Sequence, residues 1–95
     1  MSKVEKTLEK WKNSNQPVPT NEVKSVLFRF FPDTKIREGT SHRYIISHPA
    51  LKQNPHFAPK GTFLIPVKGN KVKPFYIKQI LIAIELYRKY QLENE

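Results

Sequence analysis

Two stretches of apolar residues at helical spacing most constrain the fold of this chain. The first runs from Val23 to Phe31 and repeats at i, i+3, i+4, i+7 and i+8, which predicts a helix with one core-facing side. The second follows Lys73-Pro74, a typical helix start, and its apolar face is formed by Ile77, Ile80, Leu81, Ile84, Tyr87 and Tyr90. Two amphipathic helices need an apolar surface to cover, and the residues between them must supply it.

Three segments between these helices have the character of β-strands. Lys35–Arg37 is a short candidate, Arg43–His48 alternates in polarity, and Thr62–Val67 is rich in β-forming residues. Pro66 cannot donate to a ladder, so it places the third strand at an edge or at a bulge. The sequence therefore predicts an α+β fold of order α-β-β-β-α. In it, the two helices pack on one face of a three-stranded antiparallel sheet.

A further short helix is predicted near the N-terminus, with one apolar face formed by Val4, Leu8 and Trp11. Prolines and short polar residues at 13–19 end it. We therefore divide the chain into a helical extension with a linker, residues 1–19, and a main domain, residues 20–95. Trp11 is expected to anchor the extension to the main domain, with contact to a partner as the alternative.

Two details of the longer helices carry expectations of their own. Thr20 or Asn21 is expected to cap the helix that follows by accepting a free backbone N–H. Ile82 and Leu86 widen the apolar face of the last helix beyond what one core needs. Either an oligomer contact or docking of the first helix explains that excess, so the oligomeric state stays open.

The net charge of +9 is concentrated in the non-helical middle of the chain. Nine basic residues and one acid lie between Thr34 and Lys78, so this segment carries +8 of the total. Such a concentration favours a polyanionic partner, because each phosphate contact releases counterions. A basic protein that does not bind nucleic acid is the alternative.

Composition excludes several other classes of protein. The chain has no cysteine, which excludes disulfide scaffolds, thiolate metal sites and cysteine nucleophiles. No apolar run approaches the roughly 20 residues of a membrane span, and the first residues are too polar to open a signal peptide. We expect a cytoplasmic protein that does not associate with membranes.

The segment Gly39–Ile46 carries the best candidate for chemistry. It brings a polar cluster that ends in His42 to the start of an apolar strand, within the basic middle of the chain. Histidine exchanges protons near neutral pH, since its unperturbed pKa is about 6.5. His48 precedes a proline and His56 lies in a loop, and we interpret both as structural or incidental.

Several short motifs, taken in order, resemble the HicA mRNA interferase toxins, whose fold is similar to that of double-stranded-RNA-binding domains (dsRBD-like). The resemblance covers residues 22–86, about two-thirds of the chain. The motifs are Gly39 with Ser41-His42, the strand that ends at His48-Pro49, Leu64-Ile65-Pro66-Val67, a glycine-containing turn, and Lys71-Val72-Lys73-Pro74 before the last helix. Thr40 separates Gly39 from Ser41, and Lys68 stands where many family members have a second histidine.

The resemblance implies a specific activity. It makes His42 the catalytic residue of an endoribonuclease that cleaves mRNA without a metal or any other cofactor. It also implies a HicB-like antitoxin as the protein partner.

The residues near His42 fit that chemistry. A base removes the 2′-hydroxyl proton of RNA, and nearby cations stabilise the charge that develops on the phosphate. Candidate RNA-binding residues are Ser41, Arg43, Lys68, Lys71 and Lys73. The spacing of histidines and carboxylates predicts no metal site. A non-catalytic RNA-binding module and a protein-interaction domain remain as alternative functions.

Overall fold

The computed structural model describes residues 3–37, 42–55, 57 and 60–93, with the backbone alone at positions 42 and 53. In this part of the chain the elements are α1 (Lys3–Lys12), β1 (Val18–Pro19), α2 (Thr20–Phe30), β2 (Lys35–Arg37), β3 (His42–Ser47), the 3-10 helix η1 (Pro49–Gln53), β4 (Thr62–Val67), β5 (Lys71–Val72) and α3 (Pro74–Glu93). Over the described residues the fold is α+β, with three α-helices, a three-stranded antiparallel sheet and a second sheet of two strands. The predicted α+β class with a three-stranded antiparallel sheet is confirmed, whereas the two-stranded sheet was not expected.

The larger sheet has the strand order β2-β3-β4, and both pairs are antiparallel. Ile36 lies opposite Tyr44, and Tyr44 lies opposite Ile65, so these three positions share one face. β4 is an edge strand of this sheet, which is where a proline such as Pro66 is tolerated. The expectation of an edge position for Pro66 is confirmed.

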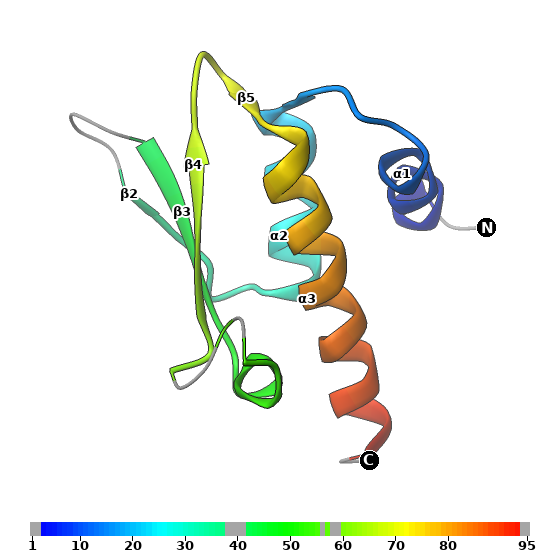
Figure 1. Cartoon of the computed structure of the whole chain (residues 1–95), viewed down its shortest axis with the longest axis vertical. Helices are drawn as coiled ribbons and strands as arrows, with labels where there is room; N and C mark the ends of the chain where they lie inside the picture. Colours follow the sequence, from blue (N-terminus) through cyan, green and yellow to red (C-terminus); the bar gives the residue numbers. More distant parts are fainter. Residues whose placement is uncertain (1–2, 38–41, 56, 58–59, 94–95) are drawn as a thin grey trace.

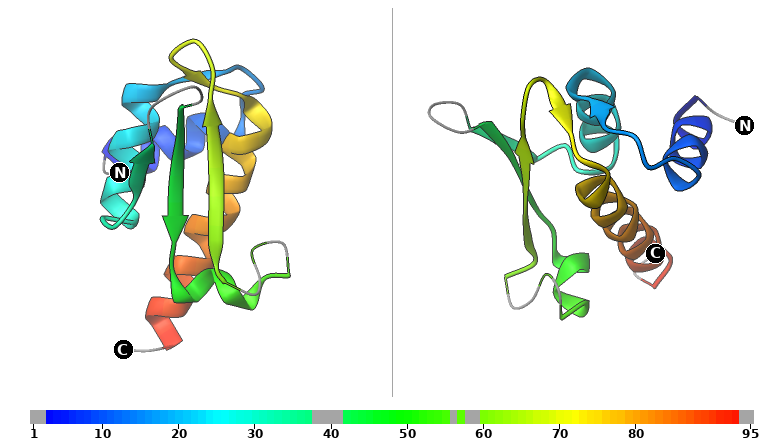
Figure 2. Two further views of the ribbon diagram at one scale, coloured as in Figure 1. Left: turned by 90° about the vertical axis from the view of Figure 1, so that its left-hand side faces the viewer. Right: turned by 45° about the horizontal axis from the view of Figure 1, so that its top comes forward.

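Both longer helices lie on one side of the larger sheet (Figure 1). Alternate strand residues on this inner face are buried, namely Tyr44, Ile46, Phe63 and Ile65. They belong to one core with buried residues of α2 and α3, which include Val23, Val26, Leu27, Ile77, Ile80 and Ile84. Full burial of an aliphatic side chain of this size contributes about 1.5–3 kcal/mol, so the two helical stripes account for much of the driving force for folding. None of the helices in the described part of the chain covers the opposite face of the sheet (Figure 2, left).

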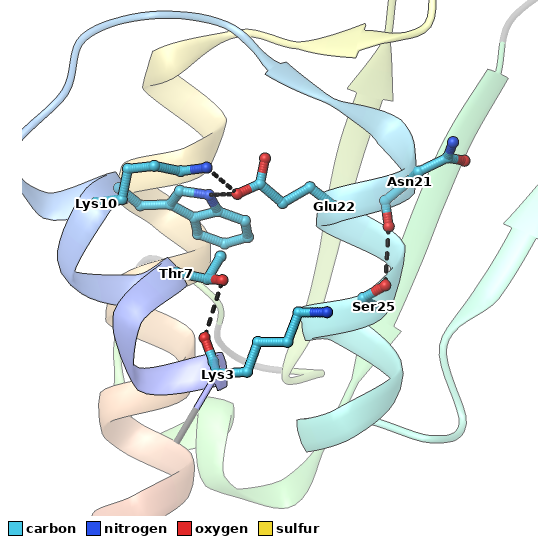
Figure 3. Close-up of polar contacts among 7 residues, drawn as sticks. Lys3, Thr7, Lys10, Asn21, Glu22 and Ser25 are labelled. Atoms are coloured by element: carbon cyan, nitrogen blue, oxygen red, sulfur yellow. Dashed lines mark hydrogen bonds and ion pairs between the residues drawn. The ribbon is translucent and has the colours of Figure 1, made fainter. Parts of the chain in front are cut away.

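The N-terminal helix α1 is part of the same core. Leu8 and Trp11 are buried, and only 1% of Trp11 is exposed. The Trp11 Nε1–H donates to Glu22 Oε1 at 3.4 Å, and Lys10 Nζ lies 2.5 Å from the same oxygen (Figure 3). The prediction that Trp11 anchors the extension is therefore confirmed, and its anchor on α2 is Glu22.

α1 also packs against α3. Lys78 Nζ donates to the carbonyl of Lys12 at 3.1 Å, and Arg88 forms an ion pair with Glu5. A cation near the last carbonyls of a helix is favourable, because these groups carry the negative end of the helix dipole. Docking of the first helix thus accounts for part of the wide apolar face of α3, although Ile82 remains 39% exposed.

Candidate nucleic-acid interface

His42 is the first residue of β3, and its backbone pairs with Val67, the last residue of β4. Position 42 therefore lies at the end of the sheet where β4 ends. Lys68 is the residue that follows its register partner, Val67. Its strand parity is that of Tyr44, whose side chain is on the inner face. Ser41, the neighbouring candidate, lies outside the described residues.

A hollow of about 390 Å³ is present at this end of the sheet. We call it the sheet-end hollow, and it is lined by Thr20, Lys24, Ile36, Tyr44, Val67, Gly69 and Asn70. These residues come from the start of α2, from the inner face of the sheet and from the turn between β4 and β5. Three elements that are distant in sequence thus enclose one polar concavity beside position 42.

The turn between β4 and β5 has a specific geometry. Lys68 and Lys71 exchange backbone hydrogen bonds of 3.0 and 3.1 Å, and the two residues between them, Gly69 and Asn70, have φ angles of +60° and +62°. Two successive positive φ angles define a type I′ hairpin turn, for which glycine and asparagine are the favoured residues. The turn holds Lys68 and Lys71 directly opposite each other, and both are exposed.

The start of α2 is not capped as predicted. Pro19 occupies the N-cap position and no side chain caps the helix, so the expectation for Thr20 or Asn21 is wrong. Instead, the Thr20 N–H donates to the carbonyl of Asn70 at 3.0 Å. Thr20 is already the first residue of the helix, and its side chain forms a hydrogen bond with Tyr44.

Tyr44 lines the hollow and is buried, with 4% of its surface exposed. Burial raises the pKa of Tyr44, and its hydrogen bond with Thr20 partly offsets that rise. The phenol therefore keeps its proton throughout the neutral range.

The proposed phosphate-binding residues do not all lie together. Lys68 and Lys71 flank the turn, and Lys73, also exposed, precedes α3. Arg43 has the opposite strand parity to Tyr44, which puts it on the outer face of the sheet, away from the hollow. By the same alternation Lys68, two residues after Pro66, has the parity of its register neighbour Arg43, and Lys68, Lys71 and Lys73 are not among the residues that line the hollow.

Sequence reasoning missed Thr20, Lys24 and Asn70 as residues of the hollow. Lys24 is one helical turn after Thr20, so the two lie on one side of α2, and this spacing could have linked them. No signal in the sequence links either residue to Asn70, because their proximity depends on the pairing of β1 with β5.

His48 has a structural role, as predicted. Its Nδ1 accepts from the Ala50 N–H at 3.0 Å and so caps η1. The imidazole makes edge contacts with the rings of Phe31, Tyr87 and Tyr90 at centroid distances of 5.8, 5.1 and 5.4 Å. This burial lowers the pKa of His48, while the charge of Asp33 acts in the opposite direction.

Searches for other kinds of site and for relatives of this chain gave negative results. Among the described residues, no three or more histidine, aspartate or glutamate side chains gather in a way that could hold a metal ion. Nor does any helix in the described ranges have the length and apolar character that crossing a membrane requires. No family model, curated protein or solved structure matches the chain.

Proposed function

We propose that this chain is a HicA-like, metal-independent endoribonuclease that cleaves mRNA, with His42 as its general base. The observation that carries the proposal is the pairing of His42 with Val67, which brings position 42 to the end of the sheet beside the exposed Lys68–Lys71 turn. The order α2-β2-β3-β4-α3, with both helices on one face of the sheet, is compatible with a dsRBD-like fold and supports the same proposal.

The reaction needs a base, an internal nucleophile and positive charge. His42 takes the proton from a ribose 2′-hydroxyl, and the 2′-oxygen then forms a bond to the adjacent phosphorus. The bond from phosphorus to the 5′-oxygen breaks, and this oxygen takes a proton from water. The products are a 2′,3′-cyclic phosphate and a free 5′-hydroxyl, so no oxidant, reductant or cofactor is consumed.

The charges at the sheet end fit such a reaction. Lys24 lines the sheet-end hollow, and Lys68 and Lys71 flank Gly69 and Asn70, which also line it. Cations at this place stabilise the negative charge that develops on the phosphate oxygens. By its resemblance to the HicA toxins, the chain would have a HicB-like antitoxin as its protein partner.

Incubation of the purified protein with a structured mRNA fragment in EDTA tests the proposal. Wild-type protein and a His56→Ala control should both release fragments with 2′,3′-cyclic phosphate ends. His42→Ala should cleave about 10²–10⁴-fold more slowly, the usual contribution of a general base, and should still bind RNA. Equal cleavage by His42→Ala and wild type would refute the role of His42. RNA binding by wild type without cleavage would instead identify a non-catalytic RNA-binding module.

A further inference from the structure

The face of the larger sheet that turns away from the helices carries a second concentration of positive charge. The registers Lys35–Ile45–Leu64 and Arg37–Arg43–Pro66 place these six residues on that face, which we call the outer face. No helix formed by the described residues lies over it (Figure 2, left), and Leu64 is 46% exposed. The strands β2, β3 and β4 contain no acidic residue.

Arg37 and Arg43 are direct cross-strand neighbours on this face. The Cβ atoms of such a pair lie about 4.5–5.5 Å apart, and like charges at this distance are destabilising. The Nε of Arg43 is in addition buried and without a hydrogen-bond partner. A buried guanidinium donor that is left unpaired costs free energy, and an anion bound to the two guanidinium groups would remove the repulsion between them.

We propose that Arg37 and Arg43 together bind a phosphodiester of the RNA strand, an inference that rests on the proposed function. Guanidinium groups match phosphate oxygens with two parallel hydrogen bonds, which fits a pair of arginines better than a pair of lysines. Lys35 extends the positive charge along β2, because it lies two residues from Arg37 on the same face. Ile45 and Leu64 offer apolar surface to the adjoining ribose and base.

The positions of the two charged sites indicate the form of the RNA. Arg43 follows His42 in β3, and Pro66 precedes Val67 in β4, so the outer-face arginines and the sheet-end hollow lie back to back at one end of the sheet. A single strand can bend around this end and contact both faces. A duplex is a stiff cylinder and presents its backbone to one face only. The substrate class is therefore single-stranded RNA.

Fluorescence anisotropy with a short 2′-O-methyl oligonucleotide, which lacks the attacking hydroxyl, measures binding without cleavage. The test variant is Arg37→Gln/Arg43→Gln. The matched control is Lys6→Gln/Lys89→Gln, which removes two exposed charges from α1 and α3. For single strands each neutralised phosphate contributes about 0.7 to the slope of log K against log salt, so the arginine variant, which loses one phosphate site, should lose about 0.7 from the slope. With equal binding at 1 M salt, this loss corresponds to about fivefold weaker binding at 0.1 M.

Four comparisons make the result decisive. The control variant should keep the wild-type slope, and wild type should bind the single strand more tightly than the same sequence as a duplex. The arginine variant should unfold at the same or a higher urea concentration, because it removes a like-charge pair. Arg37→Lys/Arg43→Lys should keep the slope but bind more weakly. Lysine retains the positive charge but lacks the planar guanidinium group that forms two parallel hydrogen bonds with phosphate.

An unchanged slope in the arginine variant, or tighter binding to the duplex, would overturn the inference. Unchanged RNA binding together with loss of binding to a poly-glutamate peptide would assign the outer face to an acidic protein partner instead. Cleavage of unmodified RNA tests the nuclease proposal separately. Wild-type protein that binds through the arginines and does not cleave would refute the nuclease activity alone.

Discussion

The backbone N–H of Thr20 donates a hydrogen bond to the carbonyl of Asn70, with 3.0 Å between nitrogen and oxygen. This bond joins the first residue of α2 to the turn that follows β4. The adjoining pairing of Val18 with Val72 fixes the same two segments together, and Val72 is fully buried. The sheet-end hollow depends on this junction, since Thr20 and Asn70 both line it.

Asn70→Val should weaken the junction. Asn70 has a φ of +62°, a left-handed conformation that asparagine and glycine tolerate and that a β-branched residue does not. We expect Asn70→Val to lower the free energy of unfolding by about 1–2 kcal/mol, measured by urea denaturation. Asn70→Gly is the control and should unfold close to wild type, because the backbone carbonyl that binds Thr20 is kept. Equal stability of the valine and glycine variants would show that the turn does not need this conformation.

Much of the fold could be predicted because its signals are local. The period of the apolar residues between Val23 and Phe31 identified α2, and the β-forming run at Thr62–Val67 identified β4. Pro66 indicated an edge strand because the missing N–H is a property of the residue itself.

The sheet-end hollow could not be predicted in the same way. β1 and β5 are two residues each, too short for any periodic pattern, and they pair across more than half of the chain. Thr20 has a side chain suited to helix capping, but Pro19 takes the N-cap position, and the Thr20 hydroxyl contacts Tyr44 of the sheet instead. The start of α2 and the contacts of Thr20 depend on tertiary pairing, which is why the cap prediction was wrong and Thr20, Lys24 and Asn70 were missed.

Trp11→Ala tests whether α1 is an integral part of the domain. Trp11 is 1% exposed within the shared core, so its truncation should lower the free energy of unfolding by about 3–5 kcal/mol. Leu92→Ala is the control, since Leu92 is 74% exposed and its loss should change stability by less than about 0.5 kcal/mol. Urea denaturation followed by circular dichroism measures both variants. If both have the same stability, α1 does not contribute to the core.

His48 should make the protein less stable in mild acid. The pKa of His48 is lower in the folded protein than its ordinary value of 6.5, which applies to the unfolded chain. In mild acid the unfolded chain therefore binds a proton at His48 more readily than the folded protein does. The stability that neutral His48 contributes is therefore present above about pH 6.5 and is lost as the pH falls through its lowered folded-state pKa. The urea midpoint of wild type should accordingly fall between pH 7 and pH 5.

His48→Asn isolates this effect. The asparagine side chain can still accept the Ala50 N–H at the start of η1, but it does not titrate. The fall in the urea midpoint between pH 7 and pH 5 should be smaller in this variant, while His42 and His56 contribute equally to both proteins. An identical fall in wild type and His48→Asn would contradict the assignment of this pH dependence to the aromatic contacts of His48.

Kinetics should separate the lysines of the turn from the arginines of the outer face. Lys68 follows Val67, the register partner of position 42, and Lys71 pairs with Lys68, so in the proposed reaction their charges act where the phosphate becomes more negative in the transition state. Arg37 and Arg43 are further from the turn along the outer face and contribute equally to binding of the substrate and of the transition state. Lys68→Gln/Lys71→Gln should therefore lower kcat by about tenfold, less than the loss of a buried oxyanion donor, whereas Arg37→Gln/Arg43→Gln should raise KM and leave kcat unchanged. Initial rates on a single-stranded RNA substrate measure both parameters, and a lysine variant that changes KM alone would place the reacting phosphate away from the turn.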